Sequence, residues 1–530
     1  MRRLAIAVKR VRGPARPVAS LRVTTAAARV EGPPGSAGAA GGSREVVAAA
    51  ATTLRVGGTA VDAALAAAFA AVMSEPALAS LGGGGFLLSA RPGAEPDLLD
   101  FFVNVPGLGG GPVVPHVETV VVDFARTGSA AASSEQVFHG GWGTVGVPGC
   151  LSGYLDAHAR DGRLELAQVV APAIAYARGG VQLSAGQRTF MHLVGDLLDL
   201  TPESTLVFDE AVRTGRYVNA RYADLLEAIG SGHVRGLAHH EVGDALLLGS
   251  QAGGGLLTVA DLESYRARRR APITIERAGA RVWTNPPPSV GGSIVTGALA
   301  RLAEAAGEGS VRWAEVAEAL ADATVAQRGP GQVPTGTTHV SVVDAEGGFA
   351  AITTSNGSGS GTVVPGWGVA LNNMLGEEDL RPADGSALPP GARMGSMMAP
   401  TLVELADGSR TALGTGGSER IRSALLGVLV RLIDEGWPLA AAIDAPRVHL
   451  TGTGPVHLEP GLADEDLADL ATLARRRGWP GLEPWPQRNL YFGGVHAVRR
   501  AVDGTVEAVG DARRTGSVGV VRPDGSVRNA

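Results

Sequence analysis

The sequence contains almost no cysteine and almost no lysine. Of its 530 residues, only Cys150 is a cysteine and only Lys9 is a lysine. A single thiol excludes an internal disulfide and a thiolate metal cluster, and the chain therefore needs no oxidising compartment. Because Lys9 lies near the start, in a segment expected to be disordered, the chain offers no Schiff-base lysine, phosphate-loop lysine or serine–lysine dyad.

Composition also limits the possible partners. Aromatic residues make up 4% of the sequence and the formal net charge is −6, so base-stacking surfaces and a basic nucleic-acid footprint are both lacking. The apolar stretch from Ala60 to Met73 is too short to span a bilayer and contains Asp62. With 45% hydrophobic residues the chain can bury a large core. We expect a folded protein without nucleic-acid or membrane partners.

Residues 1–42 are predicted to be a flexible leader. Basic residues dominate until the first acid, Glu31, and a run rich in glycine, alanine and proline continues to Gly42. A secretion signal needs an unbroken apolar stretch of about 7–15 residues, whereas the stretch from Leu4 to Val8 is interrupted by Lys9. We therefore expect a cytoplasmic location.

Helix and strand signals begin at Ser43. This residue is a plausible N-cap for a helix that runs through Leu54 and ends at Gly57-Gly58, and an alanine-rich helix follows to about Ser74. A helix that is apolar on most sides is a buried one. Gly and Pro recur through residues 105–135, which are predicted to be a loop.

Two short runs rich in Val, Ile, Phe and Thr flank an acidic break with two glycines, a pattern that predicts a β-hairpin. If the loop is centred between the runs, antiparallel pairing places Val343 opposite Phe349 and Thr337 opposite Ser355. A slip of one residue would send Ser355 to the other face and leave Thr354 near Thr337.

Gly336-Thr337 at the head of this hairpin suggests self-cleavage. Glycine tolerates the strained backbone that a side-chain hydroxyl needs to attack the carbonyl before it. Cleavage would free an α-amine on Thr337 with an ordinary pKa of about 7.7–8.0, which suits a general base for the threonine's own hydroxyl. On this stretch alone, an ordinary β-hairpin is the simpler interpretation.

Other motifs favour the catalytic interpretation. The hairpin resembles the processed threonine region of the γ-glutamyltranspeptidases, which are N-terminal nucleophile hydrolases. Further motifs of that family occur in the same order along the chain: Gly57-Gly58-Thr59-Ala60-Val61-Asp62-Ala63-Ala64, Leu81-Gly82-Gly83-Gly84-Gly85-Phe86, Val147-Pro148-Gly149, Leu371-Asn372-Asn373-Met374, Ala399-Pro400-Thr401, Gly416-Gly417-Ser418-Glu419-Arg420-Ile421 and Ala445-Pro446-Arg447-Val448-His449.

The resemblance implies a fold and a processing site. The fold is a single α/β unit, a four-layer αββα sandwich of two antiparallel sheets between helix layers. Cleavage between Gly336 and Thr337 would give a large subunit, residues 43–336, and a small subunit, residues 337–530, which stay associated.

The resemblance also implies site roles. Thr337 would be the nucleophile, and Ser355 would orient its hydroxyl. Gly416 and Gly417, at the start of a helix, would supply backbone N–H groups to an oxyanion hole. Contacts to the amino-acid head of a substrate would come from Asn356, Glu377 and Ser396. No metal and no organic cofactor is implied.

The sequence departs from the family at the substrate clamp. Transpeptidases grip the α-carboxylate of a γ-glutamyl group with an arginine after an Asp-Phe pair, and here Phe102 follows Asp100-Phe101. Of the family's serine pair before Pro-Thr, only Ser396 is present.

Three functions follow. The first is hydrolysis or transfer of γ-glutamyl amides such as glutathione, with water or an amine, such as an amino acid, as acceptor. The second is an amide acylase of the same fold with a different acyl group, as in the cephalosporin acylases. The third is a non-catalytic homologue that acts as a binding protein and remains uncut.

Overall fold

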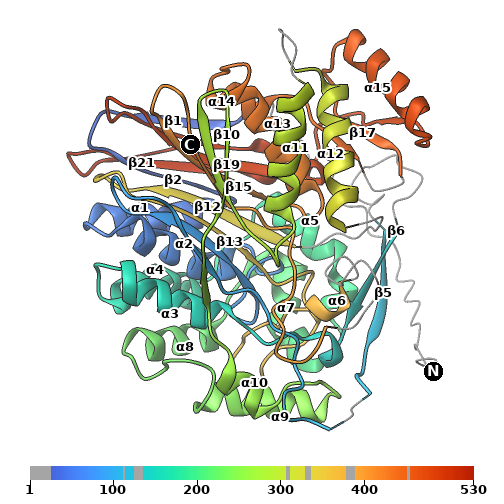
Figure 1. The fold of residues 1–530 in the computed structure, drawn as a ribbon. Helices are drawn as coiled ribbons and strands as arrows, with labels where there is room; N and C mark the ends of the chain where they lie inside the picture. The colour runs from blue at the N-terminus through green and yellow to red at the C-terminus, as the bar shows by residue number, and fades with distance from the viewer. Residues whose placement is uncertain are drawn as a thin grey trace.

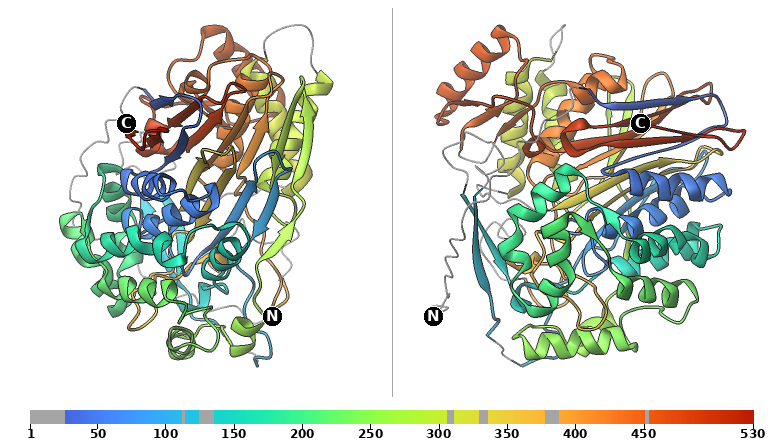
Figure 2. Two further views of the ribbon diagram at one scale, coloured as in Figure 1. Left: turned by 90° about the vertical axis from the view of Figure 1, so that its left-hand side faces the viewer. Right: turned by 180° about the vertical axis from the view of Figure 1, so that it is seen from behind.

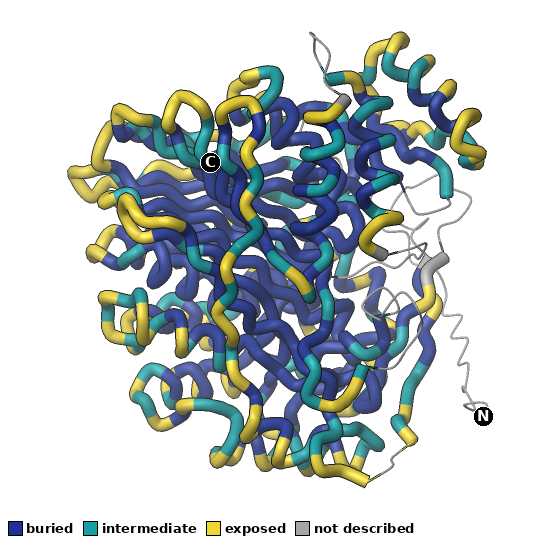
Figure 3. The backbone as a smooth tube through the Cα atoms, in the orientation of Figure 1, coloured by how far each residue is buried: buried dark blue, intermediate teal, exposed yellow. Residues whose placement is uncertain are grey.

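Two antiparallel sheets lie face to face between two layers of helices (Figure 1). The computed structural model describes residues 26–111, 114–123, 135–305, 311–328, 336–377, 388–450 and 454–530. In the views of Figure 2, helices from the first half of the chain cover one sheet and yellow-green and orange helices cover the other. Both sheets are buried along most of their length (Figure 3). The predicted αββα architecture is confirmed.

The sheets contain seven and eight strands. In spatial order, the first sheet consists of β1 (Ala28–Gly32), β20 (Val506–Gly510), β19 (Gly494–Arg500), β15 (Arg410–Gly416), β14 (Thr401–Glu404), β11 (Ala280–Thr284) and β10 (Ile273–Arg277). The second consists of β22 (Val527–Asn529), β21 (Ser517–Val521), β2 (Ala37–Gly41), β12 (Thr337–Val343), β13 (Phe349–Ser355), β3 (Gly84–Ala90), β4 (Asp97–Asp100) and β9 (Arg268–Arg270).

The helices fall into two groups. On the outer face of the eight-stranded sheet and beyond it lie α1 (Arg44–Arg55), α2 (Ala60–Ser74), α3 (Cys150–Asp161), α4 (Leu166–Gly179) and α8 (Ala220–Gly230). On the side of the seven-stranded sheet lie α11 (Gly291–Ala305), α12 (Trp313–Arg328), α13 (Arg420–Ile433), α14 (Leu439–Asp444) and α15 (Asp464–Arg477).

Further helices and strands lie outside these two groups and the two large sheets. They are the helices α5 (Ala185–Leu193), α6 (Gly195–Leu198), α7 (Pro202–Thr214), α9 (Glu241–Ala252) and α10 (Val259–Ser264), the strand pairs β5 (Glu118–Asp123) with β6 (Glu135–Gly140) and β7 (Val181–Gln182) with β8 (Arg216–Tyr217), and the small sheet of β16 (Val448–Leu450), β17 (Val456–Leu458) and β18 (Leu482–Pro484).

The helices before the eight-stranded sheet form where the sequence predicts them. The Ser43 hydroxyl accepts a hydrogen bond from the Val46 N–H at 3.3 Å and caps α1. Thr59 and Asp62 form a reciprocal capping box at the start of α2. Every residue of α2 is buried, as its apolar composition requires.

The predicted hairpin register is also confirmed. Strands β12 and β13 pair with Thr337 opposite Ser355 and Val343 opposite Phe349. On its other side β12 pairs with β2, and β13 pairs with β3. Thr337 therefore starts an inner strand, and all the residues of β12 and β13 are buried.

Two expectations are wrong. Residues 28–41, placed in the flexible leader, form β1 and β2, one in each sheet; residues 1–25 lie outside the described part. The Ala-Gly sequence of β2 does not indicate a strand. Small residues fit this position because the other sheet is close: a Cβ added at Gly38 would lie 2.8 Å from Val506. Residues 118–123, placed in a loop, form β5.

None of the helices in the described ranges is long and apolar enough to cross a membrane.

Candidate active site

Thr337 lies at the head of β12, between the two sheets. Its side chain is on the same face as His339, whose ring lies against Gly414 of the opposite sheet: a Cβ added at Gly414 would be 2.3 Å from that ring. Burial lowers the pKa of His339 well below its ordinary value, so this neighbour of the site is neutral at pH 7. The ring contacts the hydroxyls of Thr353 and Ser341 at 2.7 and 2.8 Å.

Ser355 links the threonine to the peptide bond before it. The Ser355 Oγ donates to the carbonyl oxygen of Gly336 at 2.5 Å and accepts from the Gly357 N–H at 3.0 Å. The Thr337 Oγ1 lies 3.4 Å from the same Ser355 oxygen. Ser355 is thus closer to the carbonyl that a self-cleavage would attack than to the nucleophile it was expected to orient.

Gly336 has no room for a side chain. A Cβ added there would lie 2.5 Å from the Gly357 carbonyl oxygen, and the Gly336 N–H donates to that same oxygen at 3.0 Å. The glycine before Thr337 therefore serves close backbone packing in the uncut chain.

Gly416 and Gly417 come to Thr337 from the other sheet. Gly416 is the last residue of β15, and a Cβ added to it would lie 2.0 Å from the Thr337 carbonyl oxygen. Gly417 has φ +132°, and Ser418 has φ 54°. The chain thus turns sharply from β15 into α13, and only a glycine allows Thr337 to approach this closely.

Two of the residues expected to hold a substrate, Asn356 and Glu377, lie close to Ser355. Asn356 follows Ser355 directly, and its Nδ2 donates to the Leu371 carbonyl at 3.3 Å. The Glu377 carboxylate lies close to the residue after Asn356, because a Cβ added at Gly357 would lie 3.2 Å from the Glu377 Oε1. Both side chains are buried beside the Thr337–Ser355 pair.

Ser396 lies beside the turn before α11. Its backbone carbonyl accepts hydrogen bonds from the Val290 N–H at 2.8 Å and the Ser289 hydroxyl at 2.8 Å. Its own hydroxyl accepts from the Met398 N–H at 3.1 Å. These bonds fix the turn before α11.

Phe102, which replaces the expected arginine, is a core residue. Its ring stacks on Phe86 at 5.7 Å, and its carbonyl accepts a hydrogen bond from the Tyr265 hydroxyl at 2.6 Å. Arg393 also donates to that carbonyl, but its remaining groups contact the Arg266 carbonyl at 2.7 Å and the Asp100 carboxylate at 3.4 Å. Arg393 therefore holds backbone and Asp100 together.

Two charged residues that the sequence analysis did not select lie behind Thr337. Glu75 follows α2, and burial raises its pKa to about 7, although the hydroxyls of Thr338 and Ser43 and the charge of Arg514 act in the opposite direction. Arg514 lies over Gly416, where a Cβ would be 2.9 Å from its Nη1. Neither residue stands in a recognisable local motif, so no sequence signal pointed to it.

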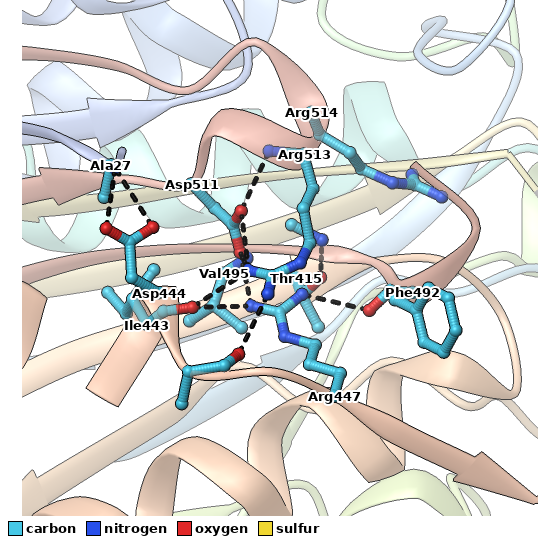
Figure 4. A network of polar contacts seen from close by, with 12 residues as sticks. Ala27, Thr415, Ile443, Asp444, Arg447, Phe492, Val495, Asp511, Arg513 and Arg514 are labelled. Atoms are coloured by element: carbon cyan, nitrogen blue, oxygen red, sulfur yellow. Dashed lines mark hydrogen bonds and ion pairs between the residues drawn. The ribbon is translucent and has the colours of Figure 1, made fainter. Parts of the chain in front are cut away.

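A buried ionic network supports this side of the site (Figure 4). Asp511 accepts hydrogen bonds from Arg447 and from the Val495 N–H, and Arg513 pairs with Glu459 at 2.6 Å. Burial alone would raise the pKa of Asp511, but Arg447 and Arg513 lower it to about 2. Because Val495 adjoins the strand position paired with Gly416, the network anchors the strand beside that glycine.

A separate cavity of about 640 Å³ lies beside α3 and α10. Its lining includes Tyr265, Asp156, Glu263 and His239, with charges of both signs. In the described part of the chain, no three His, Cys, Asp or Glu side chains are grouped so as to hold a metal ion.

Two stacked antiparallel sheets between helix layers, with a hydroxyl residue heading an inner strand, define the fold of the N-terminal nucleophile hydrolases. The family model for γ-glutamyltranspeptidase matches residues 47–329 and 312–521. The chain therefore belongs to the γ-glutamyltranspeptidase family, a family of hydrolases and acyltransferases.

Individual relatives are consistent with this family assignment. The chain is 28% identical to a glutathione hydrolase proenzyme of Pseudomonas aeruginosa, over 88% of this chain and 92% of the relative. It is 30% identical to the Acylase ACY 1 proenzyme of Pseudomonas sp. strain SE83, over 77% and 81%. In fold it resembles a cephalosporin acylase from Bacillus halodurans, with a TM-score of 0.72 at 22% identity, over 98% of this chain and 99% of that one.

Proposed function

We propose that the chain is an autoprocessed γ-glutamyl hydrolase or transferase that works through an acyl-enzyme on Thr337. One observation carries the proposal: the Ser355 hydroxyl lies within hydrogen-bond distance of both the Gly336 carbonyl oxygen and the Thr337 hydroxyl. A nucleophile, the carbonyl before it and a donor to that carbonyl are therefore in place in the uncut chain.

Self-cleavage uses these three groups. The Thr337 Oγ1 attacks the Gly336 carbonyl carbon, and the Ser355 hydroxyl donates to the oxyanion that forms. The carbon–nitrogen bond then breaks, and the nitrogen receives the proton that the hydroxyl lost. Water hydrolyses the resulting ester, which leaves a carboxylate on Gly336 and a free amine and hydroxyl on Thr337.

Turnover repeats the attack on a substrate amide. The free amine accepts the hydroxyl proton, and Oγ1 adds to the substrate carbonyl. The N–H groups of Gly416 and Gly417 stabilise the oxyanion, and the protonated amine passes its proton to the leaving nitrogen. Water or an amine acceptor then releases the acyl group from Thr337, and the two chains formed by cleavage remain associated around the site.

The substrate class rests on the relatives. A glutathione hydrolase that aligns along most of the chain supports γ-glutamyl amides such as glutathione. The Acylase ACY 1 relative and the core position of Phe102 favour, as a second candidate, an acyl group without the amino-acid head. Turnover of γ-glutamyl-p-nitroanilide against an acyl anilide that lacks the amino group separates the two.

Intact-mass spectrometry tests the chemistry. The purified protein should give two fragments, the second beginning at Thr337. Thr337→Ala should remain one chain without activity, and Thr337→Ser should be cut slowly. Thr338→Ala is the control, because its side chain lies on the opposite face of β12 and cleavage should persist. Cleavage of Thr337→Ala at this bond, or an active uncut protein, contradicts the mechanism.

A further inference from the structure

The backbone of residues 416–418, here called the oxyanion loop, is strained. Gly417 has φ +132°, and Ser418, which is not a glycine, has φ 54°. A residue other than glycine in the left-handed region is uncommon and persists only where its surroundings fix it. All three residues of the loop are buried. Contacts from other segments must therefore hold the loop in this conformation.

The loop also contains an unused hydrogen-bond donor. Gly417 lies between the end of β15 and the start of α13, and among the described residues its N–H has no hydrogen-bond acceptor. Buried backbone N–H groups are nearly always paired, so this donor is available to an oxyanion. The Arg420 N–H donates to the Gly417 carbonyl at 3.0 Å, and the Ile421 N–H donates to the Ser418 carbonyl at 3.0 Å. The orientation of the loop therefore depends on the position of the first turn of α13.

A short 3₁₀ turn, η5 (Leu490–Phe492), leads into the segment that packs on the oxyanion loop. A Cβ added at Gly493 would lie 3.1 Å from the Gly416 carbonyl oxygen, and one added at Gly417 would lie 3.3 Å from the Gly493 Cα. The next residue, Gly494, pairs with Gly416 in the sheet, and its N–H donates to the Thr415 hydroxyl at 2.8 Å. This segment supports the loop from the side of β19.

Arginine side chains bind every carbonyl group of η5. The hydrogen bonds run from the Arg514 Nε to Leu490 at 3.3 Å, from the Arg420 Nε to Tyr491 at 3.0 Å and, as Figure 4 shows, from the Arg447 Nη1 to Phe492 at 3.0 Å. Arg420 is the first residue of α13, directly after the loop and Glu419. It therefore links the helix that follows the oxyanion loop to the turn beside it.

The Arg420 side chain is held by packing as well as by its hydrogen bond. It is buried, and its guanidinium lies 4.8 Å above the Tyr491 ring. That ring stacks on Trp485 at 4.7 Å, and the Asn489 side chain accepts a hydrogen bond from the Tyr491 N–H at 2.9 Å. A planar guanidinium that donates to a carbonyl and stacks on the ring of the same residue has little freedom to move. Tyr491 is thus a rigid anchor for Arg420.

We infer that Arg420 is a positioning residue for the oxyanion hole. It ties the first turn of α13 to η5 and so holds Gly417 and Ser418 in the conformation that leaves the Gly417 N–H available to the substrate oxyanion. This inference rests on the proposed function and adds to it a residue that acts through the loop. Because an oxyanion forms only in the transition state, loss of Arg420 should lower kcat and leave KM nearly unchanged.

Arg420→Met tests the inference, because methionine fills a similar space without the charge and the N–H donors. For the cut protein, kcat with γ-glutamyl-p-nitroanilide should fall roughly 10- to 100-fold, less than for complete loss of an oxyanion donor, and KM should stay within about threefold. Arg420→Lys should recover part of the loss, since lysine keeps the charge and a donor but not the planar stack. If the wild-type protein prefers the acyl anilide without the amino group, that anilide serves for all variants.

Arg431→Met is the matched control for stability. Arg431 lies in the same helix, is buried, and has its guanidinium 4.6 Å above the Trp313 ring. It pairs with Glu435 at 2.7 Å, at the other end of α13 from the loop. Arg431→Met should therefore lower the melting temperature without changing kcat. An effect on kcat that is confined to Arg420 separates positioning from a general loss of stability.

Variants of Tyr491 test the anchor. Tyr491→Phe keeps the ring and the carbonyl and should behave like wild type, whereas Tyr491→Leu removes the ring and should lower kcat less than Arg420→Met does. Arg420→Met should still be cut near the wild-type rate, because Ser355 is the donor proposed for processing. If Arg420→Met does not fold or is not cut, Tyr491→Leu carries the same test, with kcat lowered and KM unchanged.

A crystal structure gives a readout without turnover. In Arg420→Met, the backbone of Ser418 should leave the left-handed region or the Gly417 N–H should change direction. An unchanged kcat in Arg420→Met, a rise in KM without a fall in kcat, or an equal fall of kcat in Arg431→Met overturns the inference. A wild-type protein that stays uncut and inactive contradicts the proposed function instead.

Discussion

Ser355→Ala should slow self-cleavage strongly while leaving the fold intact. The Ser355 hydroxyl lies 2.5 Å from the Gly336 carbonyl oxygen, which would become the oxyanion in the proposed self-cleavage. We therefore expect Ser355 to act in processing as a hydrogen-bond donor to the oxyanion. Loss of one such donor costs about 2.7–4 kcal/mol of transition-state stabilisation, and about 1.4 kcal/mol corresponds to a factor of ten. Cleavage should slow by roughly 100- to 1000-fold.

Ser355→Ala should destabilise the folded state less than it destabilises the transition state of cleavage. Alanine leaves the Gly357 N–H, which donates to Ser355 at 3.0 Å, without its acceptor, a cost of about 1–3 kcal/mol. The melting temperature should therefore fall by a few degrees, and the far-UV circular dichroism should keep its shape. A processing defect without a folding defect is the expected signature.

A denaturing-gel time course after synthesis measures the cleavage rate. Ser358→Ala is a matched control, because Ser358 is buried three residues away and its hydroxyl has no hydrogen-bond partner among the described residues. It should be cut at the wild-type rate. If Ser355→Ala is cut within about threefold of wild type, or if Ser358→Ala slows as much, the assignment of Ser355 as a donor to the scissile carbonyl is refuted.

Three further predictions concern packing and charge. Gly416→Ala should abolish turnover and lower the free energy of unfolding by about 1–3 kcal/mol, because the added Cβ would lie 2.0 Å from a backbone oxygen. Gly179→Ala is the control and should not destabilise the protein, because no atom lies within 4 Å of its added Cβ. Activity assays and melting curves compare the two variants. Asp511→Asn weakens the ion pairs of the buried Arg447 and Arg513 and should lower the free energy of unfolding by about 3–5 kcal/mol, measured by denaturant unfolding. The exposed control Asp503→Asn should leave that free energy unchanged. Glu75 has a folded-state pKa of about 7, above its ordinary value of 4.5, so it binds more protons when folded and its contribution to stability falls as pH rises from about 4.5 to 7. Glu75→Gln should remove this pH dependence, so the melting temperature of the variant minus that of wild type should rise between pH 4.5 and pH 7. If this difference stays constant over that pH range, the raised pKa of Glu75 is contradicted.

The sequence alone predicted those parts of the site that depend on local pairing. A hairpin with a short loop allows few registers, and a loop centred between the two runs places Thr337 opposite Ser355, which is the register observed. The helices after Ser43 and Thr59 were predicted for a similar reason, because capping hydrogen bonds join residues three apart. The family resemblance supplied the roles of Gly416 and Gly417, whose approach to Thr337 has no local signal.

Longer-range contacts were missed or misjudged. Strands β1 and β2 have weak β-sheet sequences, and they form because neighbours from the C-terminal end of the chain pair with them. Ser396 was assigned to the substrate, and the sequence did not show that its carbonyl and hydroxyl oxygens also accept hydrogen bonds from Ser289 and Met398. Arg514 was not selected, since nothing near it in the sequence indicates that it lies against Gly416.

The sequence determined which candidate reacting groups the protein has and how the hairpin pairs Thr337 with Ser355, because these features depend on residue identity and on contacts between residues close in the chain. Only the tertiary structure decided what surrounds Thr337, including Glu75 after α2 and Arg514 from the C-terminal part of the chain. The physical reason is that burial and neighbouring charges set the chemistry of an ionisable group, and both arise only when distant segments pack together.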